Sequence, residues 1–284
     1  MSGATNDWDR SWPAPAKINL FLHVVGRRAD GYHLLQTVFR FLDHGDELRF
    51  SSRDDGEIVL ARPLPGVPPE ADLTVRAARL LRDAAGIQAG VTIDLSKWLP
   101  AGGGLGGGSS DAATTLMALN RLWSCRLSSA ELQALGLSLG ADVPVFIHGR
   151  ACFAEGVGER FTDVALPPAW YLVTVPGVSV PTAEIFRAPD LRRDTPMIVP
   201  DAWQPGMGGN DLEPVASSLY PEVARHLDWL RARGRARMSA MTGSGACCFA
   251  EFAALADADA ALADLPDGMA GFVARGVDFH PIQN

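Results

Sequence analysis

The chain has 284 residues, of which 47% are hydrophobic and 20% are charged, and its formal net charge is −8. This apolar content excludes an intrinsically disordered chain, and the length predicts one large domain or two of ordinary size. The acidic balance argues against a protein that binds nucleic acid through bulk positive charge. It still allows a small phosphate ligand, because backbone N–H groups and one lysine are enough to hold one.

The sequence lacks the signals of export and of common metal sites. Residues 1–17 contain no cationic stretch followed by an apolar one, and no run approaches eighteen apolar residues. The four cysteines form no CxxC motif, and the six histidines form no HExxH motif. We therefore expect a cytoplasmic protein with free thiols and with no membrane partner.

The N-terminal half predicts several strands and one helix before a glycine-rich loop. Residues 14–25 alternate between apolar and other side chains, which predicts a half-buried strand with Lys17 and Asn19 on one face. Further elements predicted here are a turn at 26–31, an apolar run at 33–42, strands at 47–50, 57–60 and 91–95, and a helix at 73–85 that ends at Gly86.

The glycine loop runs into a predicted helix that starts near Ser109, and Ser128 with Glu131 predicts a capping box for the next helix. Composition changes near residue 165, which predicts domains at 1–165 and 166–284. The second half predicts a strand at 170–175, a helix at 213–231, a strand at 246–252 and a helix at 254–263. Alternating strands followed by helices favour an α+β fold with a half-exposed sheet.

Six of the seven residues from Gly102 to Gly108 are glycine. Without Cβ atoms, successive N–H groups can converge on an anion, and the following helix adds its own free N–H groups and the positive end of its dipole. A triphosphate is the ligand that this loop predicts. A flexible linker is the weaker interpretation, a Walker loop would need GK[ST], and neither HRD nor DFG of the protein kinases is present.

Two other residues complete a set suited to phosphoryl transfer. Lys17 would present an ammonium group beside Asn19, and Asp142 lies in the segment LGADVP. Alone, Lys17 is more simply an edge-strand lysine and Asp142 a turn or cap residue. A phosphate cradle, a cation and a carboxylate together are what transfer to a hydroxyl needs. A small-residue turn at 242–246 is either a second phosphate contact or a plain hairpin turn.

Three blocks occur in order: PAPAKINLFLHVVGRRADGYH, then LPAGGGLGGGSSDAA with LGADVPVF, then TGSGACCFAEF. With VSVPTAEIF, they cover nearly the whole chain, and on them the sequence resembles the GHMP kinase superfamily. The resemblance implies a two-domain fold, with an N-terminal domain like ribosomal protein S5 domain 2 and a ferredoxin-like C-terminal domain. It also implies an ATP-dependent kinase whose small-molecule substrate is a diphosphocytidyl-methylerythritol, phosphorylated on its 2-hydroxyl for isoprenoid synthesis.

The same resemblance implies residue roles. Lys17 and Asp142 inherit the catalytic positions, with Asp142 orienting or deprotonating the hydroxyl and Lys17 stabilising the developing charge. The resemblance further implies Mg²⁺, with Ser110 as a candidate ligand and no other ligand assigned. The ATP phosphates are assigned to Pro100, Ala101, Gly102, Gly103, Gly104, Leu105, Gly106, Gly107, Gly108, Ser109 and Ser110. The substrate is assigned to Asn19, Tyr32, His33 and Phe186.

Two residues depart from the pattern of the family. Asp111 places a carboxylate in the first turn of the helix, where it would repel a triphosphate unless it faces away or meets the metal. Asp72 stands where the family often has Asn, which leaves the adenine contacts open. A mevalonate or homoserine kinase, and a nucleotide-binding module without catalysis, are the alternative functions.

Overall fold

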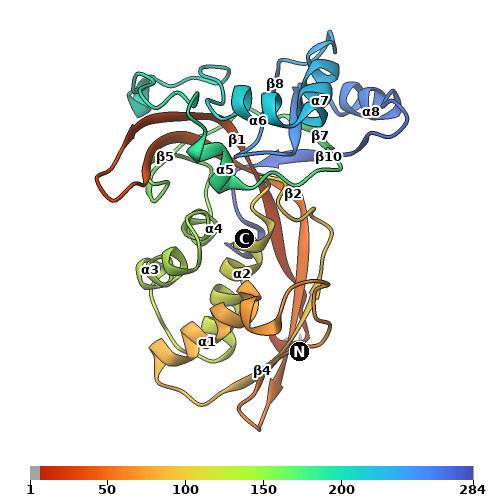
Figure 1. Ribbon diagram of the computed structural model, residues 1–284. Helices are drawn as coiled ribbons and strands as arrows, with labels where there is room; N and C mark the ends of the chain where they lie inside the picture. The colour runs from red at the N-terminus through yellow and green to blue at the C-terminus, as the bar shows by residue number, and fades with distance from the viewer. Residues whose placement is uncertain (1–6, 284) are drawn as a thin grey trace.

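A ten-stranded sheet runs through the molecule (Figure 1). The computed structural model describes residues 7–283, so residues 1–6 of the segment assessed for a secretion signal lie outside it. The strands are β1 (Trp12–Arg27), β2 (His33–Arg53), β3 (Ile58–Leu60), β4 (Gly90–Ser96), β5 (Cys152–Gly156), β6 (Arg160–Asp163), β7 (Trp170–Val175), β8 (Met238–Met241), β9 (Cys248–Phe252) and β10 (Ala270–Val277). Their order is β3-β4-β2-β10-β7-β9-β8, with β1 and β5 also on β2 and β6 on β5.

Strand β2 joins the two halves of the sheet. The sequence predicts an apolar run at 33–42 and a separate strand at 47–50, but both belong to this one 21-residue strand. One side of β2 pairs with β1, and the other side pairs in turn with β5, β10 and β4. Only β3 and β4 pair in parallel among the described strands, which together with the separate helices confirms the α+β class.

The prediction that β1 is half exposed is wrong. Nearly every residue from Trp12 to Val24 is buried, because hydrophobic clusters cover both faces of the strand. Register shifts interrupt its pairing with β2, one of them between Asn19 and Leu22. Phe21 therefore joins Leu20 in the same cluster instead of pointing away from it.

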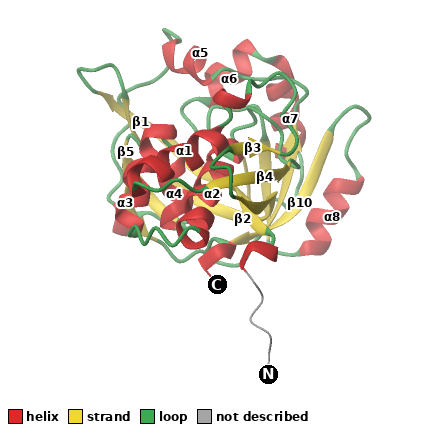
Figure 2. Cartoon of the chain, turned by 90° about the horizontal axis from the view of Figure 1, so that it is seen from below, coloured by secondary structure: helices red, strands yellow, loops and turns green. Residues whose placement is uncertain are grey.

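Four helices cover β1, β2 and β4 in the N-terminal half: α1 (Leu73–Ala85), α2 (Gly107–Leu122), α3 (Ser129–Leu139) and α4 (Val143–His148) (Figures 1 and 2). The predicted bounds of α1 are confirmed, with Asp72 as its N-cap and Gly86 ending it in the left-handed conformation at φ 64°. The capping box of Ser128 and Glu131 at the start of α3 is confirmed as well.

The C-terminal half carries α5 (Thr182–Arg187), α6 (Glu213–Leu219), α7 (Pro221–Arg231) and α8 (Leu255–Ala263) around β7–β10 (Figure 1). The prediction of a single helix at 213–231 is wrong. The first helix ends at Leu219, and a second helix begins at Pro221, whose nitrogen has no hydrogen to donate to the preceding turn. Short 3-10 turns lie at Asp7–Asp9, Pro69–Ala71, Pro200–Ala202 and Pro281–Gln283.

The four cysteines are free thiols, as the sequence predicts. Cys152, Cys247 and Cys248 are buried in the core, whereas Cys125 is only partly buried. Within residues 7–283, no helix has the length and apolar character needed to cross a bilayer.

Candidate active site

The glycine-rich loop ends at the N-terminus of α2. Gly102, Gly104 and Gly106 have φ values of 69°, 76° and 72°, a conformation that residues with a Cβ rarely adopt. Helix α2 begins at Gly107, slightly before the predicted start, so Gly107 and Gly108 belong to its first turn. The first turn of a helix leaves its N–H groups without partners in the helix, and such a turn after a glycine-rich loop is a suitable anion site.

Three hydrogen bonds to carbonyl groups of the loop hold it in place. The Lys17 amide donates to the Leu105 carbonyl at 2.9 Å, and the Cys247 amide donates to the Gly103 carbonyl at 3.0 Å. Thr242 Oγ1 lies 3.3 Å from the Gly104 carbonyl oxygen. A Cβ atom on Gly104 would overlap the Thr242 carbonyl, so this glycine is needed for a close approach of two chain segments. The turn at 242–246 is thus both the β8–β9 connection and a neighbour of the loop.

Lys17 and Asp142 form an ion pair beside the glycine-rich loop. Lys17 Nζ lies 3.2 Å from Asp142 Oδ2, and the two side chains are 3% and 37% exposed. Lys17 Nζ also donates to Asn19 Oδ1 at 2.7 Å, as expected for neighbours on one face of β1. Although Asp142 stands at the N-cap position of α4, its side chain caps no backbone N–H. The carboxylate is therefore open to the solvent side of the site, and a purely structural capping role does not account for it.

These residues line a cavity of about 570 Å³, a size usual for ligand pockets. Of the predicted site residues, the lining includes Lys17, Asn19, Pro100, Ala101, Gly102, Gly103, Gly104, Gly106, Gly107, Gly108, Ser109, Asp142 and Phe186. Leu105 and Ser110 lie near this set in the chain but have buried side chains, in the core and in the first turn of α2. Any contact of Leu105 with a phosphate would have to come from its main chain.

Of the three aromatic residues assigned to the substrate, Phe186 lines the cavity, whereas Tyr32 and His33 do not. The His33 and Phe186 rings stack with centroids 4.9 Å apart and planes 29° apart, although they are 153 positions apart in the chain. Tyr32 is 65% exposed and does not line the cavity. The structure thus brings Phe186 and His33 together and leaves Tyr32 in solvent at the β1–β2 turn.

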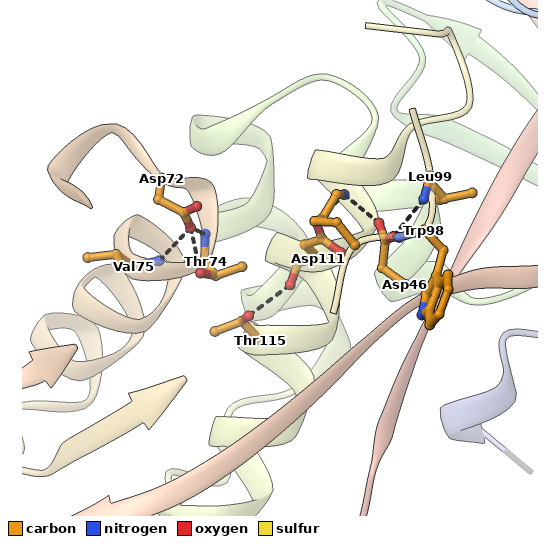
Figure 3. Close-up of polar contacts among 9 residues, drawn as sticks. Asp46, Asp72, Thr74, Val75, Trp98, Leu99, Asp111 and Thr115 are labelled. Carbon is orange, nitrogen blue, oxygen red and sulfur yellow. Dashed lines mark hydrogen bonds and ion pairs between the residues drawn. The ribbon is translucent and has the colours of Figure 1, made fainter. Parts of the chain in front are cut away.

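Asp111, the first departure from the family pattern, lines the cavity together with Lys97, with which it forms an ion pair. Figure 3 shows the Asp111 side chain beside Asp46. Lys97 Nζ donates to Asp111 Oδ2 at 2.8 Å and also to Asp46. Asp46 additionally accepts the amides of Trp98 and Leu99, at 2.6 and 2.9 Å. Burial, with Asp46 nearby, raises the pKa of Asp111 to about 7, against the opposing charge of Lys97. Lys97 therefore lowers the repulsion that this carboxylate would exert on a phosphate.

Sequence reasoning missed Lys97 and Asp46, because each is an ordinary charged residue that gains a role only through a partner far along the chain. Asp72, the second departure, accepts from the amides of Thr74 and Val75, so one of its oxygens is committed to capping α1 (Figure 3). Asp72 nevertheless lines the cavity.

Comparisons with known proteins show the family of the chain. The family model for the GHMP kinases N terminal domain matches residues 72–150, and the model for the GHMP kinases C terminal matches residues 200–271. The 4-diphosphocytidyl-2-C-methyl-D-erythritol kinase of Dechloromonas aromatica is 62% identical over 95% of this chain and 98% of its own length. The kinase of the same name from Thiobacillus denitrificans is 60% identical over 96% of this chain and 97% of its own length.

Solved structures give the same result. A crystal structure of 4-(cytidine 5'-diphospho)-2C-methyl-D-erythritol kinase superposes with a TM-score of 0.79 at 37% identity, covering 94% of this chain and 99% of that one. The homoserine kinase of Cytophaga hutchinsonii reaches a TM-score of 0.74 at 15% identity, which shows a shared fold alone. The chain thus has the two-domain fold of the GHMP kinases. The chain belongs to the 4-diphosphocytidyl-2-C-methyl-D-erythritol kinase family within the GHMP kinases.

Proposed function

We propose that this chain transfers the γ-phosphoryl group of ATP to the 2-hydroxyl of 4-diphosphocytidyl-2-C-methyl-D-erythritol, giving the 2-phosphate and ADP in the non-mevalonate isoprenoid pathway. The observation that carries the proposal is the Lys17–Asp142 ion pair, 3.2 Å apart, beside a glycine-rich loop that leads into helix α2. Phosphoryl transfer needs positioning and charge stabilisation more than covalent chemistry, and these groups supply both.

The ATP polyphosphate is assigned to the loop from Pro100 to Ser110. Its N–H groups and the N-terminus of α2 favour negative charge, and the glycines leave room for close approach of the phosphates. The position of Gly106 supports this assignment, since a Cβ there would lie 2.9 Å from the Phe146 ring and 3.1 Å from Lys17 Cε. The cradle is therefore built directly against the catalytic lysine.

Asp142 acts on the substrate hydroxyl and Lys17 on the phosphoryl group that is transferred. The Asp142 carboxylate accepts the hydrogen of the substrate hydroxyl, which orients that oxygen toward the γ-phosphorus and receives its proton as the new bond forms. The buried ammonium of Lys17 stabilises the negative charge on the transferred group. Asn19 holds the Lys17 ammonium through the 2.7 Å contact and is held in turn by its own donation to Thr37 at 2.9 Å.

The diphosphocytidyl end of the substrate is assigned to Tyr32, His33 and Phe186, with Asn19 nearer the reacting hydroxyl. Supporting this, His33 and Phe186 already form a stacked pair, and the exposed Tyr32 ring is free to cover a base from the solvent side. The names of the relatives, which share about 60% of their residues with this chain, point to the same substrate.

Mg²⁺ is assigned as the metal of the reaction, where it neutralises charge on the ATP phosphates. Mg²⁺ at phosphate sites usually takes only one or two oxygens from the protein, and no cluster of three or more His, Cys, Asp or Glu ligands occurs among residues 7–283. Ser110 Oγ fits this limited demand, because it is buried in the first turn of α2 without a hydrogen-bond partner. The division into domains 1–165 and 166–284 and a cytoplasmic location also remain part of the proposal.

A direct assay tests the proposed reaction. Purified chain, Mg-ATP and the diphosphocytidyl substrate are incubated, ADP is measured by coupling, and ³¹P NMR locates the new phosphate. We expect one ADP per 2-phosphate formed, and no turnover of mevalonate or homoserine in the same panel. Phosphorylation of those alcohols in place of the cytidine compound would reject this proposal in favour of another GHMP kinase activity.

A further inference from the structure

Arg193 donates hydrogen bonds to several carbonyl groups in the chain segment that contains Phe186. Its Nη2 donates to the carbonyls of Phe186 and Ala188 at 3.0 and 2.7 Å, and its Nη1 donates to the carbonyl of Leu191 at 2.9 Å. These carbonyls lie at and beyond the C-terminal end of α5, and the Ala188 carbonyl also accepts from the Leu191 amide at 3.3 Å. A single guanidinium therefore fixes the course of the chain on both sides of Ala188, and so fixes the position of the Phe186 ring.

The same guanidinium reaches across to the other ring of the stacked pair. Arg193 Nε donates to His33 Nε2 at 3.2 Å. An arginine Nε carries a hydrogen at every ordinary pH, so Nε2 of His33 must be the acceptor in this contact. A neutral imidazole that accepts at Nε2 carries its hydrogen on Nδ1. Burial, together with the nearby Arg193 and Arg27 charges, lowers the pKa of His33 and so favours this neutral ring.

The Nδ1 atom of His33 is left to act as a donor. Within the described part of the chain, no protein group accepts a hydrogen bond from it. Cytosine offers acceptors at N3 and O2, whereas uracil carries a hydrogen on N3. A fixed Nδ1–H donor therefore matches the edge of cytosine and opposes the N3–H of uracil.

We propose that Arg193 is a positioning residue for base selection: it holds Phe186 against His33 and fixes the imidazole hydrogen on Nδ1, so that the pair prefers a cytosine over a uracil diphosphate. The inference rests on the proposed function, which supplies the cytidine substrate. It deepens that function by assigning base preference to a residue that need not touch the base.

Steady-state kinetics with two substrates test the inference. Wild type, Arg193→Ala and Arg193→Lys are compared on the cytidine substrate and on its uridine analogue, each with Mg-ATP. For Arg193→Ala we expect KM for the cytidine substrate to rise about 10- to 100-fold with kcat within about threefold and KM for ATP unchanged. The cytidine-to-uridine ratio of kcat/KM should fall about tenfold. Arg193→Lys should be intermediate, because lysine keeps the charge but not the planar fork.

Arg192→Ala is the matched control, because Arg192 is the adjacent arginine and its ion pair is with the exposed Asp194. We expect it to behave as wild type in every constant. An unchanged KM and base preference in Arg193→Ala would overturn the inference. Equal loss of kcat and of ATP affinity would overturn it too, because that pattern indicates general damage to the fold.

Histidine ¹⁵N NMR of the free protein provides a readout that needs no turnover. We expect His33 to show a protonated Nδ1 and an unprotonated Nε2, and to lose this preference in Arg193→Ala. A wild-type spectrum with the hydrogen on Nε2 would overturn the inference. If wild type does not phosphorylate the cytidine substrate, the proposed function fails, while the NMR result still decides how Arg193 holds His33.

Discussion

Lys17 and Asp142 meet across 3.2 Å although they are 125 positions apart, one buried in a central strand and the other at the open start of a short helix. The asymmetry in exposure suits their assigned tasks. A buried ammonium acts strongly on nearby charge, because little water screens it, and an open carboxylate is within reach of a substrate hydroxyl.

Replacing either member of this pair is expected to remove most of the turnover. For Asp142→Asn and Lys17→Ala we predict losses in kcat of at least about 100-fold, as is usual when a base or a charge stabiliser is removed. ATP binding, measured by calorimetry, should survive Asp142→Asn because the loop is untouched. Asp94→Asn, on an exposed ion pair with Arg62, is the control and should retain wild-type activity. Wild-type turnover in Asp142→Asn would refute its assigned role.

The glycine loop predicts a second outcome. Gly106→Val would place a side chain between Phe146 and Lys17 at a φ of 72°, so ATP affinity should fall at least about tenfold while the protein remains folded. Gly268→Val is the matched control, because Gly268 has a φ of 80° and its Cβ would meet no atom within 4 Å. Equal effects of the two variants on ATP affinity would show that backbone strain alone, and not the cradle, is responsible.

His280 predicts how stability depends on pH. Burial lowers the pKa of His280 from 6.5 to about 3, so an unfolded chain takes up its proton at a pH where the folded chain does not. Below about pH 6.5 this difference favours unfolding, and the stability of the folded chain falls progressively as the pH falls toward 3. The His280→Asn variant keeps an acceptor for the Ile282 amide, which Nδ1 now accepts at 3.2 Å, and removes the titration.

We expect the unfolding free energy of wild type to fall relative to His280→Asn by up to about 1.4 kcal/mol per pH unit over this range. Urea unfolding at pH 8, 6 and 5 measures it, and the pH 8 value subtracts the constant cost of altered packing around Phe41 and Phe146. A difference between the two proteins that is the same at every pH would contradict the prediction.

Metal removal separates catalysis from stability. Because no three-ligand cluster occurs in residues 7–283, a chelator should abolish turnover while changing the apparent Tm by less than about 1 °C. Activity should return when Mg²⁺ is added. A fall in Tm of several degrees on chelation would instead reveal a metal that holds the fold together.

Local patterns in the sequence predicted the elements that local chemistry determines. Helix α1 has its predicted bounds because Asp72 caps one end and Gly86 ends the other, and the capping box of α3 depends on two residues three apart. The prediction failed where packing decides, as in β1, whose alternation suggested one exposed face although clusters cover both.

The site shows the same limit. Lys17, Asp142 and the glycines carry motifs that the sequence displays, whereas Lys97, Asp46 and Arg193 are ordinary charged residues in the sequence. Their roles depend on partners that the fold brings close, such as His33, which lies 160 positions from Arg193. No local signal could have found them, because the information lies in the tertiary contacts.

The most direct measurement is a crystal structure of the chain with a nonhydrolysable ATP analogue and the diphosphocytidyl substrate. We predict that the β- and γ-phosphates accept hydrogen bonds from N–H groups of residues 102–108, and that the substrate 2-hydroxyl lies within about 3 Å of an Asp142 carboxylate oxygen. A polyphosphate bound away from those residues, or a different hydroxyl facing Asp142, would contradict the account.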